Sequence, residues 1–153
     1  MRLDHDWIAA HIPHQGRMCL LDEVRFWNEA SIECVSATHR APDHPLRAHG
    51  RLGSACLLEY AAQAMAVHGA LLQRSSARVA TAGLLVSARA LELWVADLDG
   101  IAGELLIRAE RQHADDNGAL YGFRVSAGDR LLAQGRAGVR FDASAPTASG
   151  SPP

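Results

Sequence analysis

The stretch that decides the fold runs from Leu52 to Arg74 and reads LGSACLLEYAAQAMAVHGALLQR. Its apolar residues lie nearly all the way round a helix: Ala55, Leu57, Leu58, Ala61, Ala62, Met65, Ala66, Val67, Ala70, Leu71 and Leu72. A helix that is apolar on almost every face is usually buried. Ser54 is the expected N-cap, because a serine hydroxyl can accept from the first free amides of a helix. We therefore expect one long helix at the centre of the molecule.

Glu59 and Gln63 are the only polar pair within the first three turns of this helix. Their spacing of i and i+4 places them on one helix face, among small residues. A carboxyl group is seldom buried without a partner or a purpose. Glu59 is therefore a candidate site residue. Gln63 is a candidate either for orienting the Glu59 carboxyl or for a hydrogen bond between the helix and the sheet.

The size and charge of the chain limit the number of domains and the kinds of partner that we expect. The 153 residues suffice for one domain with a substantial core. A net charge of -2, from 15 basic and 17 acidic residues, gives no electrostatic basis for binding nucleic acid. The final segment 142–153 consists of small residues and proline, so we expect a single domain over 1–141 followed by a disordered tail.

Cysteine and histidine usage argues against a metal or disulfide framework. Cys19, Cys34 and Cys56 are far apart and stand among apolar neighbours, which predicts buried free thiols. No cluster of His, Cys or carboxylate residues has metal-ligand spacing, so we expect neither a metal nor a cofactor. The N-terminal segment has no apolar run typical of a signal peptide, and we expect no membrane span and a cytoplasmic location.

Hydrophobic patterns predict the remaining elements. A short helix over 4–11, capped by Asp4, precedes two strands over 20–27 and 30–37 that form a hairpin. A loop rich in proline, glycine and histidine follows over 38–53. After the long helix we expect strands over 79–86 and 90–96 and a turn over 97–100. Three further strands, 104–113, 121–126 and 131–141, alternate apolar and polar residues, and the turn before the second contains Asn117-Gly118.

This order of elements predicts an α+β fold. The simplest way to bury a helix that is apolar all round is to curl an antiparallel sheet about it. Alanine at many helix positions allows the sheet to approach closely. Since one sheet cannot cover every face of the helix, we also expect a dimer.

Two segments resemble the hotdog-fold 3-hydroxyacyl-acyl-carrier-protein dehydratases. Residues 13–24, PHQGRMCLLDEV, are similar to that family's first strand, which starts Pro-His-Arg and continues with an apolar run followed by Asp and Val. The helix is similar to its Met-Pro-Gly-Val, three residues, then Glu-Ala-Met-Ala-Gln; the matching residues here are 52–55 (LGSA) and 59–63 (EYAAQ). The Gly50-Arg51-Leu52 loop resembles the divergent subgroup found with aryl-polyene pigment pathways.

The loop before the helix departs from the family pattern. Active members carry Gly-His-Phe-Pro-Gly there, and at the corresponding distance from Glu59 this chain has Pro45, with His44 beside it. His44 and His49 are both candidates for the catalytic base, and each is also explained as an ordinary loop histidine. We expect His14 to brace the loop around it, and His68 to be a hydrogen-bonded residue of the core or of an interface.

The resemblance implies a specific chemistry. A histidine takes the C2 proton of a 3-hydroxyacyl thioester, and a protonated Glu59 in an apolar setting donates to the departing hydroxyl. The backbone amides of Gly53, Ser54 and Ala55 bind the thioester oxygen, and Gln63 orients Glu59. In the family the histidine and the acid come from different subunits.

Three functions follow as alternatives. The first is a dehydratase that acts on acyl-carrier-protein or coenzyme A thioesters in fatty-acid or polyene-type biosynthesis, as a homodimer. The second is a catalytically impaired hotdog subunit that pairs with an active dehydratase. The third is an acyl thioesterase, whose typical loop signature is absent.

Overall fold

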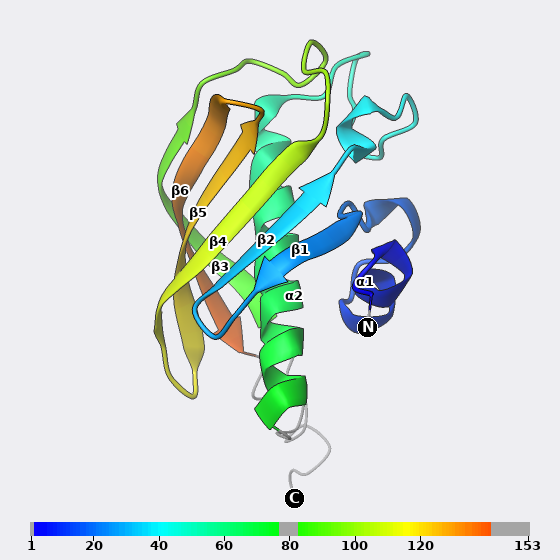
Figure 1. The fold of residues 1–153 in the computed structure, drawn as a ribbon. Helices are drawn as coiled ribbons and strands as arrows, with labels where there is room; N and C mark the ends of the chain where they lie inside the picture. Colours follow the sequence, from blue (N-terminus) through cyan, green and yellow to red (C-terminus); the bar gives the residue numbers. More distant parts are fainter. Residues whose placement is uncertain (1, 77–82, 142–153) are drawn as a thin grey trace, which may run out of the picture.

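The computed structural model describes residues 2–76 and 83–141. Within them the chain forms two α-helices, α1 (His5–His11) and α2 (Leu57–Ser76). The six strands are β1 (Glu23–Trp27), β2 (Ser31–Ser36), β3 (Gly83–Leu93), β4 (Leu105–Ala114), β5 (Gly118–Ala127) and β6 (Arg130–Phe141). They form one antiparallel sheet in the order β1-β2-β4-β5-β6-β3 (Figure 1). Three short 3-10 turns connect these elements: η1 (Gly16–Met18), η2 (Thr38–Arg40) and η3 (Ser54–Cys56).

The long helix α2 lies against one face of the sheet (Figure 1), where it contacts β2, β3, β4 and β5. Fully buried helix residues include Leu57, Tyr60, Ala61, Ala64 and Val67. Burying one large apolar side chain contributes about 1.5–3 kcal/mol, whereas alanine contributes less but lets the two layers approach. The predicted α+β arrangement of a sheet wrapped about one helix is confirmed.

The N-terminal elements follow the predicted pattern with one difference. Asp4 caps α1, because its Oδ1 accepts from the Trp7 amide at 3.1 Å. The first strand is shorter than the predicted range 20–27 and begins at Glu23. The reason is that the Leu20 backbone is bonded by side chains: its N–H donates to Gln63, and its carbonyl accepts from Thr38. These side-chain bonds take the place of the backbone hydrogen bonds that Leu20 would make to a neighbouring strand.

The segment after α2 forms one strand where two were predicted. Of the predicted range 79–86, residues 79–82 lie outside the described part of the chain. From Gly83 onward β3 is continuous to Leu93 and pairs with β6. Its register shifts between Arg89 and Glu92, where Ala90 has a φ of 51°. A bulge of this kind bends the strand without ending it.

The C-terminal meander of β4, β5 and β6 is confirmed, with tight turns at the predicted places. Asp115 Oδ1 accepts from the Asn117 amide at 2.8 Å and from the Gly118 amide at 3.1 Å, which closes the first turn. In β6 the predicted alternation breaks, since the neighbours Leu132 and Ala133 are both buried. The pairing with β5 skips Leu132, so a bulge turns both side chains inward.

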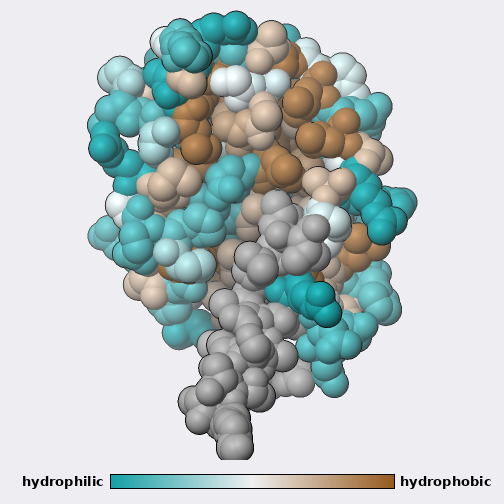
Figure 2. Space-filling view, turned by 180° about the vertical axis from the view of Figure 1, so that it is seen from behind, coloured by the Kyte–Doolittle hydropathy of each residue, from teal (hydrophilic) through white to brown (hydrophobic). Residues whose placement is uncertain are grey.

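Part of the apolar surface stays open in the single chain. β3 is an edge strand, and Leu91, Leu93 and Trp94 beside that edge are 38%, 37% and 46% exposed. On α2, Leu58 and Ala66 are only partly buried. Figure 2 shows the face opposite to that of Figure 1, where hydrophobic residues gather in its upper half. The fold of one chain therefore leaves part of its apolar surface exposed.

The helix over Ser54–Arg74 is long and apolar enough, by length and composition, to cross a membrane. From the sequence we expect no membrane-spanning segment. The packing accounts for its hydropathy, because 56% of that window is buried inside the fold. A core helix needs the same apolar residues as a membrane span.

Candidate functional site

Glu59 lies in the first turn of α2 and is held by two side chains. Its Oε2 atom is 3.0 Å from Nε2 of His14 and 3.1 Å from Nε2 of Gln63. The side chains of His14 and Glu59 are 26% and 31% exposed. The carboxylate thus stands at the border of the core, where a small molecule can reach it.

Gln63 performs both roles considered for it. Its side chain is completely buried. Its Oε1 accepts from the Leu20 amide at 2.8 Å, and its Nε2 donates to the Met18 carbonyl at 2.7 Å as well as to Glu59. Gln63 therefore ties α2 to the segment before β1 and also orients the Glu59 carboxylate.

The protonated Glu59 expected from the sequence is not what the structure shows. The hydrogen bond from His14 is the largest effect and lowers the pKa of Glu59, and Gln63 lowers it further. Desolvation acts in the opposite direction and is outweighed. Because the side chain is partly exposed and accepts two hydrogen bonds, Glu59 is a carboxylate at neutral pH in the single chain.

His44 is buried and has partners of its own. Its Nδ1 accepts from the Leu46 amide at 3.1 Å, so Nε2 carries the hydrogen and donates to the Tyr60 hydroxyl at 3.1 Å. Burial lowers the pKa of His44, and Arg47 adds to that effect. Both ring nitrogens are engaged, which leaves His44 neutral and fixed in this chain.

The Tyr60 hydroxyl continues this chain of hydrogen bonds toward Gln63. It is 2.7 Å from Thr38 Oγ1, and that hydroxyl donates to the Leu20 carbonyl at 2.9 Å. Leu20 also bonds Gln63 through its amide. Four hydrogen-bonded residues thus lie between His44 and Glu59, and His44 does not touch the carboxylate itself.

His49 lies at an exposed turn. The flanking Ala48 and Arg51 pair through two backbone hydrogen bonds of 2.8 and 2.9 Å, so His49 and Gly50 form the tip. Its φ of 53° is in the left-handed region. Among the described residues, Glu59 bonds His14 and Gln63, and neither His44 nor His49 is brought to it. A catalytic role for either of these two across a subunit boundary stays a prediction.

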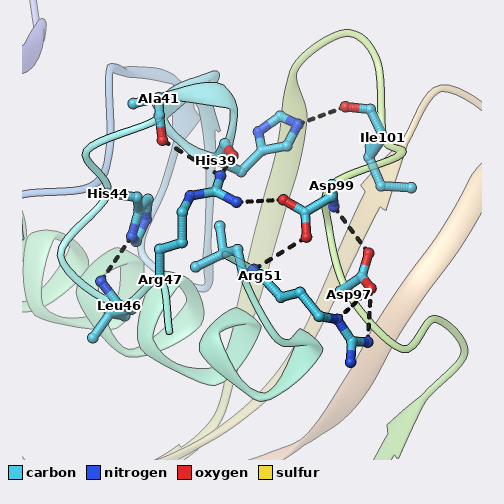
Figure 3. A network of polar contacts seen from close by, with 10 residues as sticks. His39, Ala41, His44, Leu46, Arg47, Arg51, Asp97, Asp99 and Ile101 are labelled. Atoms are coloured by element: carbon cyan, nitrogen blue, oxygen red, sulfur yellow. Dashed lines mark hydrogen bonds and ion pairs between the residues drawn. The ribbon is translucent and has the colours of Figure 1, made fainter. Parts of the chain in front are cut away.

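Ion pairs join the loop over residues 38–53 to the turn after β3 (Figure 3). Arg47 pairs with Asp99, and Arg51 donates to Asp97 Oδ2 through Nε at 3.1 Å and Nη2 at 2.8 Å. Asp99 also accepts from the Leu52 amide at 3.2 Å. The guanidinium of Arg47 is the main cause that lowers the pKa of Asp99. These contacts set the position from which the chain enters α2.

The start of α2 differs from the expected cap. The chain enters through η3, whose N-cap is Gly53 and which has no side-chain capping bond, so Ser54 is not the cap. The Ser54 amide donates to the Ala96 carbonyl at 3.1 Å. It is therefore not free to bind a thioester oxygen, and of the three predicted donors Gly53 and Ala55 stay candidates.

Two cavities are formed by the described residues of the chain. A cavity of about 510 Å³ lies along β1 and is lined by residues 2–3 and 23–27. A second, of about 310 Å³, is lined by residues 94–97, Gly100, Ile101 and Arg130. Glu59 is in the lining of neither cavity.

The described residues contain free cysteines and no metal-binding cluster. Cys19 and Cys34 are buried free thiols, as predicted, and Cys56 is partly buried. Burial raises the pKa of Cys34 and of Cys56 to about 12, which makes both unreactive. In the part of the chain that the structure describes, no group of three His, Cys, Asp or Glu side chains could hold a metal ion.

His14 is the site residue whose contact the sequence did not predict. The sequence predicts that His14 braces its own loop, yet its Nε2 atom contacts Glu59 on α2. The available signal was the Pro13-His14 pair in the segment similar to the dehydratases. That motif marked the position of His14 without naming its partner, since the contact joins residues far apart in sequence.

Comparisons with known proteins find solved structures of similar fold. The dehydratase heterocomplex ApeI:P from Xenorhabdus doucetiae has a TM-score of 0.79 at 21% identity and covers 88% of this chain and 90% of that chain. A Haemophilus influenzae thioesterase has a TM-score of 0.58 at 12% identity, covering 78% of this chain and 76% of that chain. A hypothetical thioesterase with coenzyme A from Streptococcus pneumoniae TIGR4 has a TM-score of 0.53 at 12% identity, covering 78% and 84%. No curated protein matches the sequence.

At these identities the structural matches show the fold alone, and they confirm the hotdog fold. The model of the ApeP-like dehydratases, described as ApeP dehydratase, matches residues 7–146. It spans most of α1, the whole sheet and α2, including His14, Glu59 and Gln63. The chain therefore belongs to the ApeP-like family of dehydratases.

Proposed function

We propose that this chain is a subunit of a dehydratase that removes water from 3-hydroxyacyl thioesters, and that Glu59 is its reacting carboxyl group. The observation that carries the proposal is the held carboxylate itself. Glu59 stands on the central helix, its Oε2 is fixed by His14 and Gln63, and its side chain is 31% exposed. A carboxylate placed in this way at the edge of a core is a typical proton-transfer group.

The reaction needs a proton acceptor for C2, a proton donor for the hydroxyl that leaves C3, and donors for the thioester oxygen. Glu59 supplies a proton-transfer group. The free amides of Gly53 and Ala55, in the turn that leads into α2, are the proposed donors to the oxygen. Preorganised donors of this kind typically contribute about 10²–10³ in rate.

A second hotdog subunit completes the proposed site. The support is that Glu59 lines neither of the two cavities described above, while Leu91, Leu93 and Trp94 beside the edge strand β3 are exposed. The ApeI:P structure is itself a heterocomplex. We propose a hetero-oligomer with a related subunit, or a homodimer, in the cytoplasm, with acyl carrier protein or coenzyme A as carrier of the thioester in fatty-acid or polyene-type biosynthesis.

The test compares the pure chain, alone and mixed with a hotdog dehydratase subunit from the same organism. Each sample receives 3-hydroxyacyl and enoyl thioesters, and the double bond is followed by absorbance. We expect hydration and dehydration that Glu59→Gln abolishes and that the control Glu29→Gln, on the exposed β1–β2 turn, leaves unchanged. Full activity of Glu59→Gln in the mixture would show that the chain is a non-catalytic partner.

The thioesterase alternative rests on the likeness to the thioesterase structures, at TM-scores of 0.58 and 0.53. A helix carboxylate can also activate water against a thioester. Release of free thiol, measured in the same samples, decides between the two reactions. Thiol release without a change in the double bond would replace the dehydratase proposal. The variants His44→Ala and His49→Ala test whether either histidine acts as base across the subunit boundary.

A further inference from the structure

Four arginines cross the face of the sheet that is turned away from α2. Arg108 on β4 stands between Ile107 and Ala109, which are both fully buried in the core. Since neighbouring side chains of a strand point to opposite faces, Arg108 lies on the outer face, and its side chain is 56% exposed. The same alternation and the strand pairing place three more exposed arginines on this face: Arg124 on β5, Arg136 on β6 and Arg89 on β3. We call these four residues the arginine row.

The register of the strands brings the four arginines close together. Arg108 is directly opposite Arg124, and Arg136 is directly opposite Arg89. Arg124 pairs with Gln134, two residues before Arg136, so Arg124 and Arg136 are diagonal neighbours. Directly opposite residues have Cβ atoms about 4.5–5.5 Å apart, and diagonal neighbours lie about 7–8 Å apart. The arginine row is therefore continuous across four adjacent strands, β4, β5, β6 and β3.

Only one end of the arginine row is neutralised within the described chain. Arg108 pairs with Glu33 on β2 at 3.5 Å. The other three side chains are exposed and form no ion pair with a described carboxylate. Like charges that stand directly opposite each other destabilise a sheet. The row thus lowers the stability of the fold, which is typical of residues kept for a purpose other than folding.

The surroundings of the row favour a partner with separate carboxylates over a continuous polyanion. Two further acids lie on the outer face: Glu92, which accepts from Gln134 at 2.8 Å, and Glu110, two residues after Arg108 on β4. These carboxylates and the net charge of -2 oppose the binding of nucleic acid. Individual carboxylates, in contrast, can each meet one guanidinium through two parallel hydrogen bonds.

The length and spacing of the row match one face of an α-helix. Adjacent strands are about 4.8 Å apart, so the row across four strands is about 14 Å long. Side chains at every fourth position of a helix are about 6 Å apart along its axis, and three of them span about 12 Å. Acidic residues at this spacing can therefore reach successive arginines of the row.

We propose that the arginine row is a docking surface for a partner protein that presents a helix with acidic residues along one face. The row lies on the side of the sheet opposite to α2. The proposal therefore goes beyond the proposed reaction and does not depend on the role of Glu59.

The test measures the binding of a synthetic alanine-based helical peptide with Glu at every fourth position, by calorimetry with the full chain. The reference is the same peptide with Gln at those positions. At low salt we expect the Glu peptide to bind and the Gln peptide not to bind, and we expect added salt to weaken the binding. The double variant Arg124→Gln/Arg136→Gln should bind the Glu peptide about 5-fold to 30-fold more weakly, since it loses two exposed ion pairs.

The matched control is Arg40→Gln/Arg130→Gln, which removes the same charge from two exposed arginines outside the row. It should bind the Glu peptide within about 2-fold of wild type, because exposed single substitutions change little. Absence of binding by wild type, or equal weakening in the two double variants, overturns the proposal. The second result would mean that net charge, and not the row, attracts the peptide.

Urea unfolding at low salt provides a readout that a structural role of the row would change. Because the arginines repel one another, Arg124→Gln/Arg136→Gln should be at least as stable as wild type. A clear loss of stability would show that the row serves the fold, and it overturns the proposal. Phosphatidylglycerol vesicles and single-stranded DNA are tested in parallel. Binding of either one that is lost in Arg124→Gln/Arg136→Gln, without binding of the Glu peptide, replaces the acidic helix as the partner.

Discussion

Replacing Gln63 by methionine should destabilise the protein strongly, although the two side chains are similar in size. Gln63 is completely buried and makes three hydrogen bonds, to Leu20, Met18 and Glu59. Methionine fills the same space without any strong donor or acceptor. The Leu20 amide and the Met18 carbonyl then lose their partner inside the fold.

The magnitude follows from those two backbone groups. A buried group left without a partner costs about 1–3 kcal/mol. The Leu20 amide is buried and should cost the upper part of that range, whereas the partly buried Met18 carbonyl can regain water. We expect a loss of about 2–4 kcal/mol in the free energy of unfolding. For a chain of this size that corresponds to a Tm lower by roughly 6–12 °C.

The assay is urea and thermal unfolding of the full chain, followed by circular dichroism at one fixed protein concentration, since association shifts apparent stability. Gln112→Met is the matched control. Gln112 is exposed on β4, so that change should stay within about 0.5 kcal/mol. A loss below about 1 kcal/mol for Gln63→Met would refute the view that Gln63 clamps α2 to the segment before β1.

Two further predictions concern stability. Gly118→Ala should destabilise the protein by about 2 kcal/mol or more, because the added Cβ would lie 2.3 Å from the Val139 carbonyl oxygen. Gly100→Ala, where nothing lies within 4 Å, is its control, and equal stability of the two variants would contradict the packing argument. The free energy of unfolding should also fall as pH drops from about 6.5, measured by urea titrations at several pH values. Burial lowers the pKa of three histidines, which are neutral when folded and take up protons more readily when unfolded: His39, His44 and His68. A flat profile between pH 7.5 and 5.5 would show that these rings are not buried in solution.

Local sequence patterns were sufficient for the elements themselves. The α2 helix, the three-stranded meander and its turns follow from spacing between near neighbours, which sequence displays directly. Glu59 and Gln63 were identified for the same reason, since their i,i+4 spacing brings them together on any helix. His68 was expected in the core or at an interface, and it is a hydrogen-bonded core residue, with Nδ1 2.6 Å from Tyr121 Oη and Nε2 2.8 Å from the Asn28 carbonyl.

The features that sequence reasoning missed depend on where distant segments meet. The bulges at Ala90 and Leu132 arise when strands adjust to one another across the sheet, which the sequence of one strand does not encode. The ionised state of Glu59 was missed because its charge is decided by the neighbours that reach it.

The sequence by itself determined that an acid would stand on a central helix inside a curled antiparallel sheet, because periodicity and composition dictate burial. Only the tertiary structure decided which histidine meets that acid. His44 and His49 are nearer to Glu59 along the chain, yet one is bonded to Tyr60 and the other lies on an exposed turn. His14 is brought to the carboxylate because Gln63 fastens the segment before β1 against α2, and that contact exists only in the folded chain.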